Sequence, residues 1–461
     1  MNSKEIARKK IVNYVFLIYW IMIFEGALRK WLFPQFNELI FFLRDPFVLL
    51  TYIIAFRNNI FTRDTLLTSG IVIALLFIPL IFIQVMVNKI NVLALIYGWR
   101  CYFFYLPFAF VIKDTFHQID IHKLFKQTLY VSIPLSLLAY IQFISPRSSF
   151  INTGYGEGEA FVVSGLIVRT TGTFSFTAGQ TMYAASLMAM LIFIWLYRKR
   201  YSLMTLPSLI VTTITSVTTL LVTGSRTAFF MTGLVIAGTF ISLIFTRETK
   251  LKFTGTVILV FLLLVGTVMF LGPLKDSYDA LTTRFEQASA VEGSPLSRAI
   301  APLIIFTKHI FTTPVIGEGL GVTSGGGSKL AFGKAKWFLA EDEWSRNIVE
   351  AGPGFGLLYI IYRVLFTIIL VKQCIKAAVQ DNNILPSILF GFIGYYLLAG
   401  QIASVGVFQG YTWIFVGLIM VACQKQQNES IEFTSKPFFP NIIGSVKKPL
   451  ASDFTSQSAI Q

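Results

Sequence analysis

The stretch VILVFLLLVGTVMFL, from Val257 to Leu271, decides the fold class of this 461-residue chain. It carries no charge, and its apolar side chains follow one another without the apolar and polar alternation of a membrane β-barrel strand. In lipid every backbone N–H and C=O group needs a partner within the protein, so only helices and closed barrels cross the hydrocarbon core. The stretch therefore predicts a membrane-spanning helix.

Similar apolar segments recur along almost the whole chain. Hydrophobic residues make up 55% of the sequence, 45 residues are Phe, and only 13% are charged, which lies outside the usual composition of soluble proteins. A span needs about 20 apolar residues. We therefore predict an all-α, polytopic transmembrane helix bundle of about twelve spans, near residues 11–30, 36–56, 66–87, 92–112, 124–144, 179–197, 203–222, 227–246, 251–272, 348–371, 385–404 and 408–424.

Basic residues in the short loops predict the orientation, because Lys and Arg favour the cytoplasmic side. The basic groups at 4–10, 57–63, 113–126, 198–200, 247–252 and 372–376 all fall on one side of the alternating spans. Both termini are therefore expected in the cytoplasm. This bias accounts for most of the net charge of +15, so we predict no nucleic-acid partner.

The same orientation divides the chain into a membrane domain, residues 1–424, and a polar tail, residues 425–461, that we expect to be cytoplasmic and disordered. Two long segments face the exterior: residues 145–178, and a large loop, residues 273–347, between spans nine and ten. Connections of this length usually carry function or close over a site.

Several arginines are candidate anion ligands on the outer side. Arg226 in TGSRTAFF follows Gly224 and Ser225, whose small side chains let an anion approach the backbone. Arg169 and Arg298 lie in the two outer loops. The alternative is that such an arginine extends to phospholipid head groups at the interface.

Arg44, Arg100 and Arg363 fall within predicted spans, where a central charge costs about 2.5–3.5 kcal/mol or more. They are expected to face the bundle interior. Arg44 precedes Asp45, which favours a local ion pair. Arg100 has no acidic neighbour in sequence, which leaves a bound anion or a distant carboxylate as its partner, so it is a candidate substrate-binding residue.

The stretch AEDEWSRNIVEAGPGFG, from Ala340 to Gly356, gathers carboxylates at the outer water boundary. Glu341, Asp342 and Glu343 are candidates for a general base that takes a proton from an attacking hydroxyl. The alternative is a solvated helix start whose acids favour the positive end of the helix dipole. Glu350 lies further into the helix, where pairing with an arginine is an equally good explanation.

The sequence shows no pattern typical of a metal site or of a nucleotide-binding P-loop. The three His and three Cys residues do not cluster at ligand spacings, and no GxxxxGK[ST] motif occurs. We therefore predict no metal and no cofactor. Outer arginines, carboxylates at the same level and a deep apolar bundle fit a lipid-linked phosphorylated substrate, in which guanidinium groups hold a diphosphate and a carboxylate acts as base.

Four motifs in order, VRTTGTFSFTAG (168–179), TGSRTAFF (223–230), SRAIAPLIIFTKHIFTTPVIGEGLG (297–321) and NIVEAGPGFG (347–356), are separated by apolar spans. Over roughly residues 90–375 this succession resembles the O-antigen ligase and O-antigen polymerase superfamily of bacterial inner-membrane glycan assembly. The resemblance implies a glycosyltransferase that moves a glycan from undecaprenyl diphosphate to an acceptor sugar, with inversion and without metal, on the outer face of the membrane. Other export and chain-length components would be its partners.

By the same resemblance Arg226 matches the arginine of the family's SR-small motif and Arg298 the arginine upstream of its Pro-x-x-G-x-G motif, and both would contact diphosphate. Arg169 matches the arginine before Gly-Thr-Phe. The chain departs from the ligases at Glu341, which stands where they carry a presumed catalytic histidine, so polymerase and ligase both stay open. Glu343 is an equal rival as base. Two other functional classes stay open, a transporter or flippase of lipid-linked saccharide and a non-catalytic scaffold.

Overall fold

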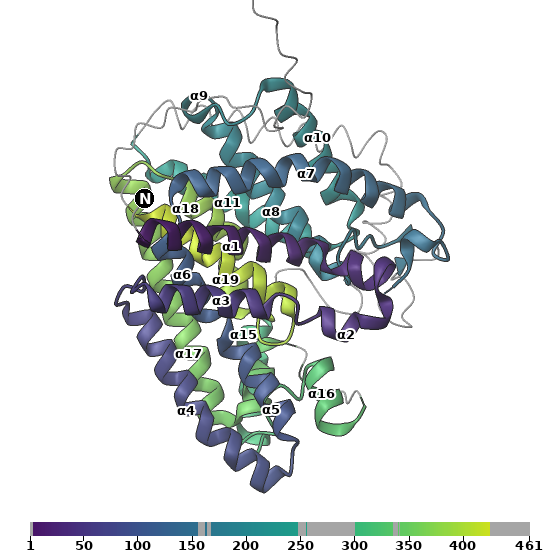
Figure 1. Ribbon diagram of the computed structural model, residues 1–461, viewed down its shortest axis with the longest axis vertical. Coiled ribbons are helices and arrows are strands. Elements are labelled where there is room, and N and C mark those ends of the chain that lie inside the picture. The colour runs from purple at the N-terminus through teal and green to yellow at the C-terminus, as the bar shows by residue number, and fades with distance from the viewer. Residues whose placement is uncertain are drawn as a thin grey trace, which may run out of the picture. The chain divides into compact units, whose positions relative to one another are not determined.

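The computed structural model describes residues 3–154, 162–163, 167–247, 255, 300–334, 340 and 342–424. These residues form helices joined by short loops (Figure 1), apart from one small antiparallel ladder. In that ladder β1 (Val162–Val163) pairs with β2 (Ile167–Val168). The all-α class predicted from the apolar runs is thus confirmed in its coarse form, as a helical bundle.

The N-terminal helices run from α1 to α7. Two of the segments are π-helices, η1 and η3, which continue α1 and α5. Their bounds are α1 (Ser3–Ala27), η1 (Leu28–Leu32), η2 (Pro34–Phe36), α2 (Asn37–Ile40), α3 (Asp45–Arg57), α4 (Thr65–Asn88), α5 (Val92–Trp99), η3 (Arg100–Phe104), α6 (Leu106–Thr115) and α7 (Gln118–Ile144).

The later helices include the longest of the described part, α17, which bends at Gly352 and Pro353. Their bounds are η4 (Phe150–Asn152), α8 (Thr177–Leu196), α9 (Arg198–Tyr201), α10 (Leu206–Val222), α11 (Arg226–Phe245), α15 (Pro302–Thr312), α16 (Gly325–Phe332), α17 (Glu343–Gln380), α18 (Leu385–Ala399) and α19 (Gly406–Cys423).

Nine helices or helix runs of the described residues are long and apolar enough to cross a membrane, and α10 and α18 are shorter apolar helices. Each coincides with one of the predicted spans. The remaining predicted span, residues 251–272, lies outside the described residues except for Gly255, as do residues 273–299, 335–339 and 341 of the predicted loop 273–347 and the whole tail 425–461. The count of twelve spans therefore stays a prediction.

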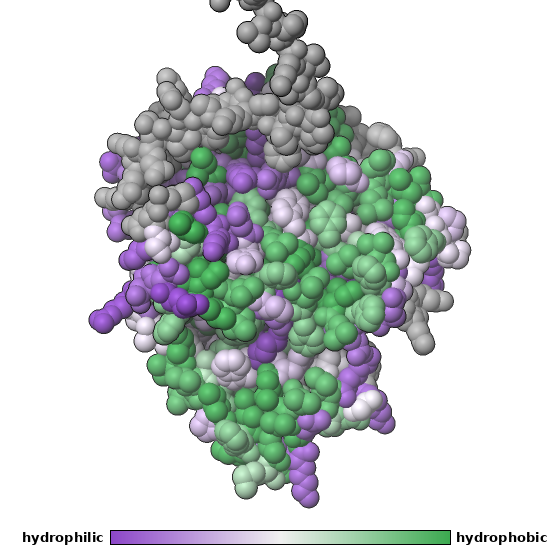
Figure 2. Space-filling view, viewed as in Figure 1, coloured by the Kyte–Doolittle hydropathy of each residue, from purple (hydrophilic) through white to green (hydrophobic). Residues whose placement is uncertain are grey.

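Burial separates central helices from peripheral ones. Helix α8 is buried along almost its entire length, and it packs against α7, α10, α11, α18 and α19. Helix α4 instead exposes large apolar side chains such as Phe82 and Met86, and Figure 2 shows apolar residues gathered over the end of the molecule where α4 lies. Exposed apolar faces of this kind suit contact with lipid. The polar side chains of the spans therefore have to find partners inside the bundle.

Candidate functional site

Five charged side chains, carried by the end of α1 with η1, by the start of α3 and by η3, form ion pairs close to one another. Arg44 Nε lies 3.1 Å from Glu25 Oε2, and Arg29 Nη1 lies 3.3 Å from Glu25 Oε1. Arg44 and Glu25 are only 1% and 5% exposed. We call this group the cationic cluster; within the described residues it comprises three cations and two carboxylates: Arg29, Arg44, Arg100, Glu25 and Asp45.

Arg100 obtains a carboxylate partner from a different helix. Its Nη2 and Nε atoms donate to the two oxygens of Asp45 at 2.6 and 2.8 Å, the bidentate geometry that suits guanidinium and carboxylate groups. The ring of Phe41 lies 5.4 Å from the Arg100 guanidinium and 5.7 Å from that of Arg29. The aromatic side chain therefore supports two cations that would otherwise face apolar surroundings.

Both π-helices carry cations of this cluster. Segment η1 holds Arg29 and Lys30, and η3 begins with Arg100. A π-turn disrupts the regular helical ladder and is frequently found at functional sites. Carbonyl groups of η3 accept side-chain hydrogen bonds instead, from Tyr52 to Phe104 (2.5 Å) and from Gln409 to Cys101. The π-turn of η3 is thus stabilised by polar side chains of α3 and α19.

Lys30 connects the cationic cluster to the TTGTF motif of the first outer loop. Its Nζ donates to Thr171 Oγ1 at 2.8 Å and to the Gly172 carbonyl at 2.9 Å, and lies 4.5 Å from the centre of the Trp31 ring. The residue is 4% exposed. All partners of this buried ammonium group in the described part of the chain are uncharged.

The TTGTF motif in turn contacts the TGSR motif. Thr170 Oγ1 donates to the carbonyl of Val222, the last residue of α10, at 3.0 Å. TGSR follows directly, with Ser225 buried at the N-cap of α11 and Arg226 as its first residue. Arg169, next to Thr170, and Arg226 are both half-buried. Two motifs that the sequence predicts on the outer side are therefore neighbours, and Lys30 binds the first of them.

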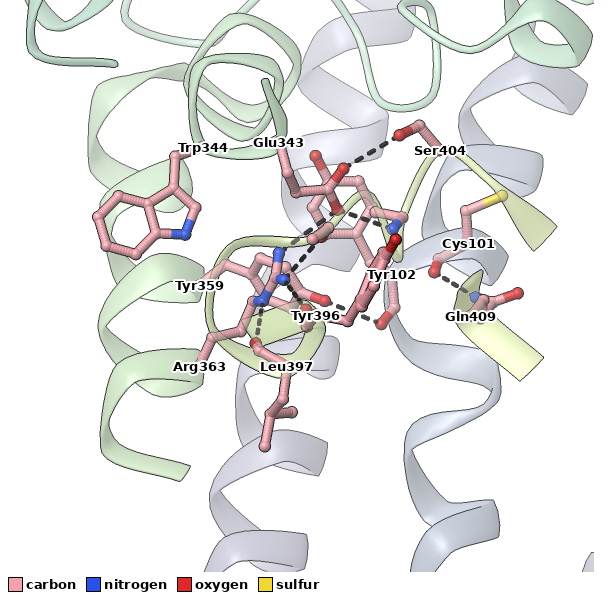
Figure 3. Close-up of polar contacts among 12 residues, drawn as sticks. Cys101, Tyr102, Glu343, Trp344, Tyr359, Arg363, Tyr396, Leu397, Ser404 and Gln409 are labelled. Atoms are coloured by element: carbon pink, nitrogen blue, oxygen red, sulfur yellow. Dashed lines mark hydrogen bonds and ion pairs between the residues drawn. The ribbon is translucent and has the colours of Figure 1, made fainter. Parts of the chain in front are cut away.

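The carboxylate of Glu343 is held in a second network, drawn in Figure 3. It lies 3.4 Å from Arg363 Nη1, and it accepts hydrogen bonds from the Ala403 N–H at 2.7 Å and the Ser404 hydroxyl at 3.0 Å. Arg363 also donates to carbonyls at the C-terminal end of α18, those of Tyr396, Leu397 and Gly400 (2.8–2.9 Å). The pair therefore closes the end of α18 and fixes the turn into α19.

The two networks share that turn. Arg44 Nη1 donates to the carbonyl of Gly406 at 3.3 Å, two residues beyond Ser404, whose hydroxyl binds Glu343. The cationic cluster and the Glu343 network therefore both bind the segment of residues 404–406. The arginine that makes this link is Arg44.

Glu350 anchors the segment that precedes α16. Its Oε1 accepts hydrogen bonds from the Thr323 N–H (3.0 Å) and hydroxyl (2.5 Å), and its Oε2 accepts one from Tyr102 at 2.9 Å. Its backbone carbonyl accepts the N–H of Gly319 at 3.2 Å. The third and fourth motifs, which include Gly317 to Gly319 and Glu350 to Gly352, therefore pack directly against each other.

Gly352 makes this contact feasible. Its φ is +79°, a conformation that disfavours side chains, and a Cβ atom there would overlap the carbonyl oxygen of Val315. Gly352→Ala is therefore expected to destabilise the contact by about 1–3 kcal/mol. Thermal unfolding in detergent, compared with Gly354→Ala at a site with no neighbour within 4 Å, measures the effect. An equal midpoint for the two variants would contradict this role.

The structure corrects one sequence prediction and explains two other arginines. Arg44 pairs with Glu25 while Asp45 pairs with Arg100, so the local pair expected between Arg44 and Asp45 is wrong. The partner of Arg100 is a distant carboxylate, one of the two options considered. Arg363, for which sequence showed no partner, binds Glu343.

Two predicted site residues, Arg298 and Glu341, lie outside the described residues. Sequence analysis did not single out Glu25, Arg29 or Lys30. The only signal there was the i to i+4 spacing of Glu25 and Arg29 at the end of an apolar run, which aligns opposite charges on one helix face.

Residues 3–154, 167–247, 300–334 and 342–424 contain no group of three or more His, Cys, Asp or Glu side chains that could hold a metal ion. No protein-family model, curated protein or solved structure matches the chain.

Proposed function

We propose that this protein is a membrane glycosyltransferase that transfers or polymerises undecaprenyl-diphosphate-linked oligosaccharide on the outer face of the bacterial cytoplasmic membrane. The observation that supports it best is Lys30. A buried ammonium group costs several kcal/mol unless an opposite charge or a full set of acceptors compensates it. Lys30 is 4% exposed and has only uncharged partners among the described residues. A phosphate group of the substrate would supply the missing charge.

The surroundings of Lys30 favour a diphosphate over a smaller anion. The Thr171 hydroxyl accepts from Lys30 and keeps its own proton to donate, and Ser225 in the neighbouring TGSR motif carries a second hydroxyl, so donors of the kind that hold phosphate oxygens are present. Arg169, two residues before Thr171, and Arg226 in the TGSR motif would add positive charge, and a guanidinium group binds phosphate bidentately. The apolar faces of the helices would accommodate the polyprenyl chain.

The proposed reaction is a single displacement. The acceptor hydroxyl attacks the anomeric carbon of the donor sugar on the face opposite the diphosphate, and the bond between that carbon and the diphosphate oxygen breaks. The leaving oxygen keeps the electron pair, and Lys30 and the outer arginines neutralise its charge. The proton of the acceptor hydroxyl passes to a carboxylate. Attack from the opposite face inverts the anomeric configuration.

Vesicles reconstituted with the purified protein and an undecaprenyl-diphosphate oligosaccharide test the proposal. Arg226→Lys is expected to slow donor consumption about tenfold, because lysine keeps the charge but loses the bidentate contact. Longer glycan on the lipid carrier identifies a polymerase, and glycan on a separate acceptor identifies a ligase.

The matched control is Arg147→Lys, at an exposed arginine of the same predicted outer side. It is expected to leave the rate unchanged. If the wild-type protein moves the donor between leaflets and consumes none of it, the transporter class is correct and the transferase proposal is wrong.

A further inference from the structure

One carboxylate on the predicted outer side is uncommitted. Glu318 is half-buried, and its side chain makes no hydrogen bond or ion pair with any described residue. Among the described carboxylates on the predicted outer side, Glu25, Asp45, Asp342, Glu343 and Glu350 all accept hydrogen bonds or pair with arginine. The other one without such a partner is Glu38, which is exposed on the four-residue helix α2.

The backbone that carries Glu318 is held on both sides. The N–H of Glu318 donates to the Val349 carbonyl at 2.7 Å. The Gln84 amide donates to the Ile316 carbonyl at 2.6 Å and accepts from the Leu320 N–H at 3.0 Å, and Asn88 donates to the Gly317 carbonyl at 2.8 Å. A rigid backbone with an uncommitted acid is what general-base catalysis requires, because the acid must be placed accurately and still be able to take a proton.

Two glycines allow the backbone turn that carries Glu318. Gly317 and Gly319, on either side of Glu318, have φ values of +70° and +134°. Such values are rare for residues with a side chain. A Cβ on Gly317 would also overlap the backbone of Glu350. The turn therefore brings Glu318 against α17 in a conformation that an ordinary sequence would not adopt.

The loop lies close to the cationic cluster. A Cβ on Gly98 of α5 would overlap the backbone of Leu320, so the two main chains are in contact. Arg100 follows Gly98 by two residues, and Glu318 precedes Leu320 by two. Chain geometry then limits the distance between the Cα atoms of Glu318 and Arg100 to roughly 17 Å. The Glu318 side chain, the acceptor and the donor sugar together can bridge the space between this loop and the cationic cluster.

We propose that Glu318 is the general base of the transfer reaction, an inference that rests on the proposed function. Its carboxylate accepts the proton of the acceptor hydroxyl as the oxygen of that hydroxyl bonds to the anomeric carbon. The bond to the diphosphate breaks, undecaprenyl diphosphate leaves with the electron pair, and Glu318 returns the proton to solvent. Glu343 and Glu350 are poorer bases here, because their oxygens already accept the hydrogen bonds that hold α17 in place.

The experiment compares Glu318→Gln and Glu318→Ala with Glu38→Gln in reconstituted vesicles, and measures donor binding and transfer separately. Glu318→Gln is expected to lower the transfer rate by about a hundredfold or more at unchanged donor affinity. Glu318→Ala is expected to recover part of the rate with added formate, which a purely structural role would not produce. Glu38→Gln is expected to behave as wild type.

Each other outcome has a distinct meaning. An active wild type with an equally active Glu318→Gln variant overturns the base assignment and leaves the transferase proposal standing. A loss of donor affinity in parallel with the rate shows that Glu318 binds substrate and is not the base. A wild-type protein that transfers nothing from any undecaprenyl-diphosphate glycan overturns both proposals.

Discussion

Replacement of Arg363 by methionine is expected to lower the free energy of unfolding by about 3–5 kcal/mol, because it leaves the buried carboxylate of Glu343 without its charge partner. Both side chains are 1% exposed or less. The same change removes the hydrogen bonds that the Arg363 guanidinium donates to three carbonyl groups at the end of α18, those of Tyr396, Leu397 and Gly400. Titration of the detergent-solubilised protein with a denaturing detergent measures the loss.

A double-mutant cycle separates two contributions of Arg363 to stability, its charge pairing with Glu343 and its hydrogen bonds to carbonyl groups. Glu343→Gln combined with Arg363→Met removes both charges and is expected to recover part of the lost stability, since no lone charge remains. Lys113→Met is the matched control, because Lys113 pairs with Asp64 at 2.5 Å with both side chains 20% exposed. Its effect is expected to stay below about 1 kcal/mol. Equal losses at Arg363 and Lys113 would contradict the structural role of the buried pair.

Lys30→Met is expected to slow glycan transfer by about a hundredfold to a thousandfold, because the ammonium group would stabilise the charge that develops on the leaving diphosphate. Methionine keeps most of the side-chain volume. The loop also keeps other anchors, since Gln142 accepts from the Gly172 N–H at 2.7 Å and Thr173 donates to the Ile23 carbonyl at 2.6 Å. Transfer rate and donor affinity in reconstituted vesicles are the measurements.

Two further variants test whether the effect depends on the positive charge at position 30. Lys30→Arg keeps the charge and is expected to retain more activity than Lys30→Met. Lys308→Met removes an exposed lysine from α15 and is expected to have no effect. A folded Lys30→Met protein with wild-type transfer would reduce Lys30 to a structural link between η1 and the TTGTF motif, and the main support for the proposed function would be lost.

The apolar runs were sufficient to predict the helical spans, because an apolar segment of about 20 residues satisfies its own backbone only as a helix. Each of the described spans lies where hydropathy predicted it. The positions of the motifs relative to the spans were predicted from the same pattern. The outer loop residues Arg298 and Glu341 stay predictions.

The pairing of charges depended on the tertiary structure. Sequence placed Arg44 beside Asp45, but side chains on successive helical positions point in different directions, so each residue found a partner on another segment. Likewise, the sequence predicts the neighbouring acids at 341–343 as candidate bases, but the structure pairs Glu343 with Arg363. The carboxylate without a described partner, that of Glu318, belongs to a different motif.

The sequence by itself determined that this chain forms apolar helices with polar groups at their predicted outer ends, because lipid imposes a local rule on every segment. Only the tertiary structure decided which of those groups meet, because the contacts of Lys30 with Gly172, of Arg363 with Glu343 and of Glu350 with Tyr102 depend on how whole helices pack. Such packing depends on the fit between helix surfaces and on hydrogen bonds for the buried polar groups throughout the bundle, so it cannot be predicted from a short stretch of sequence.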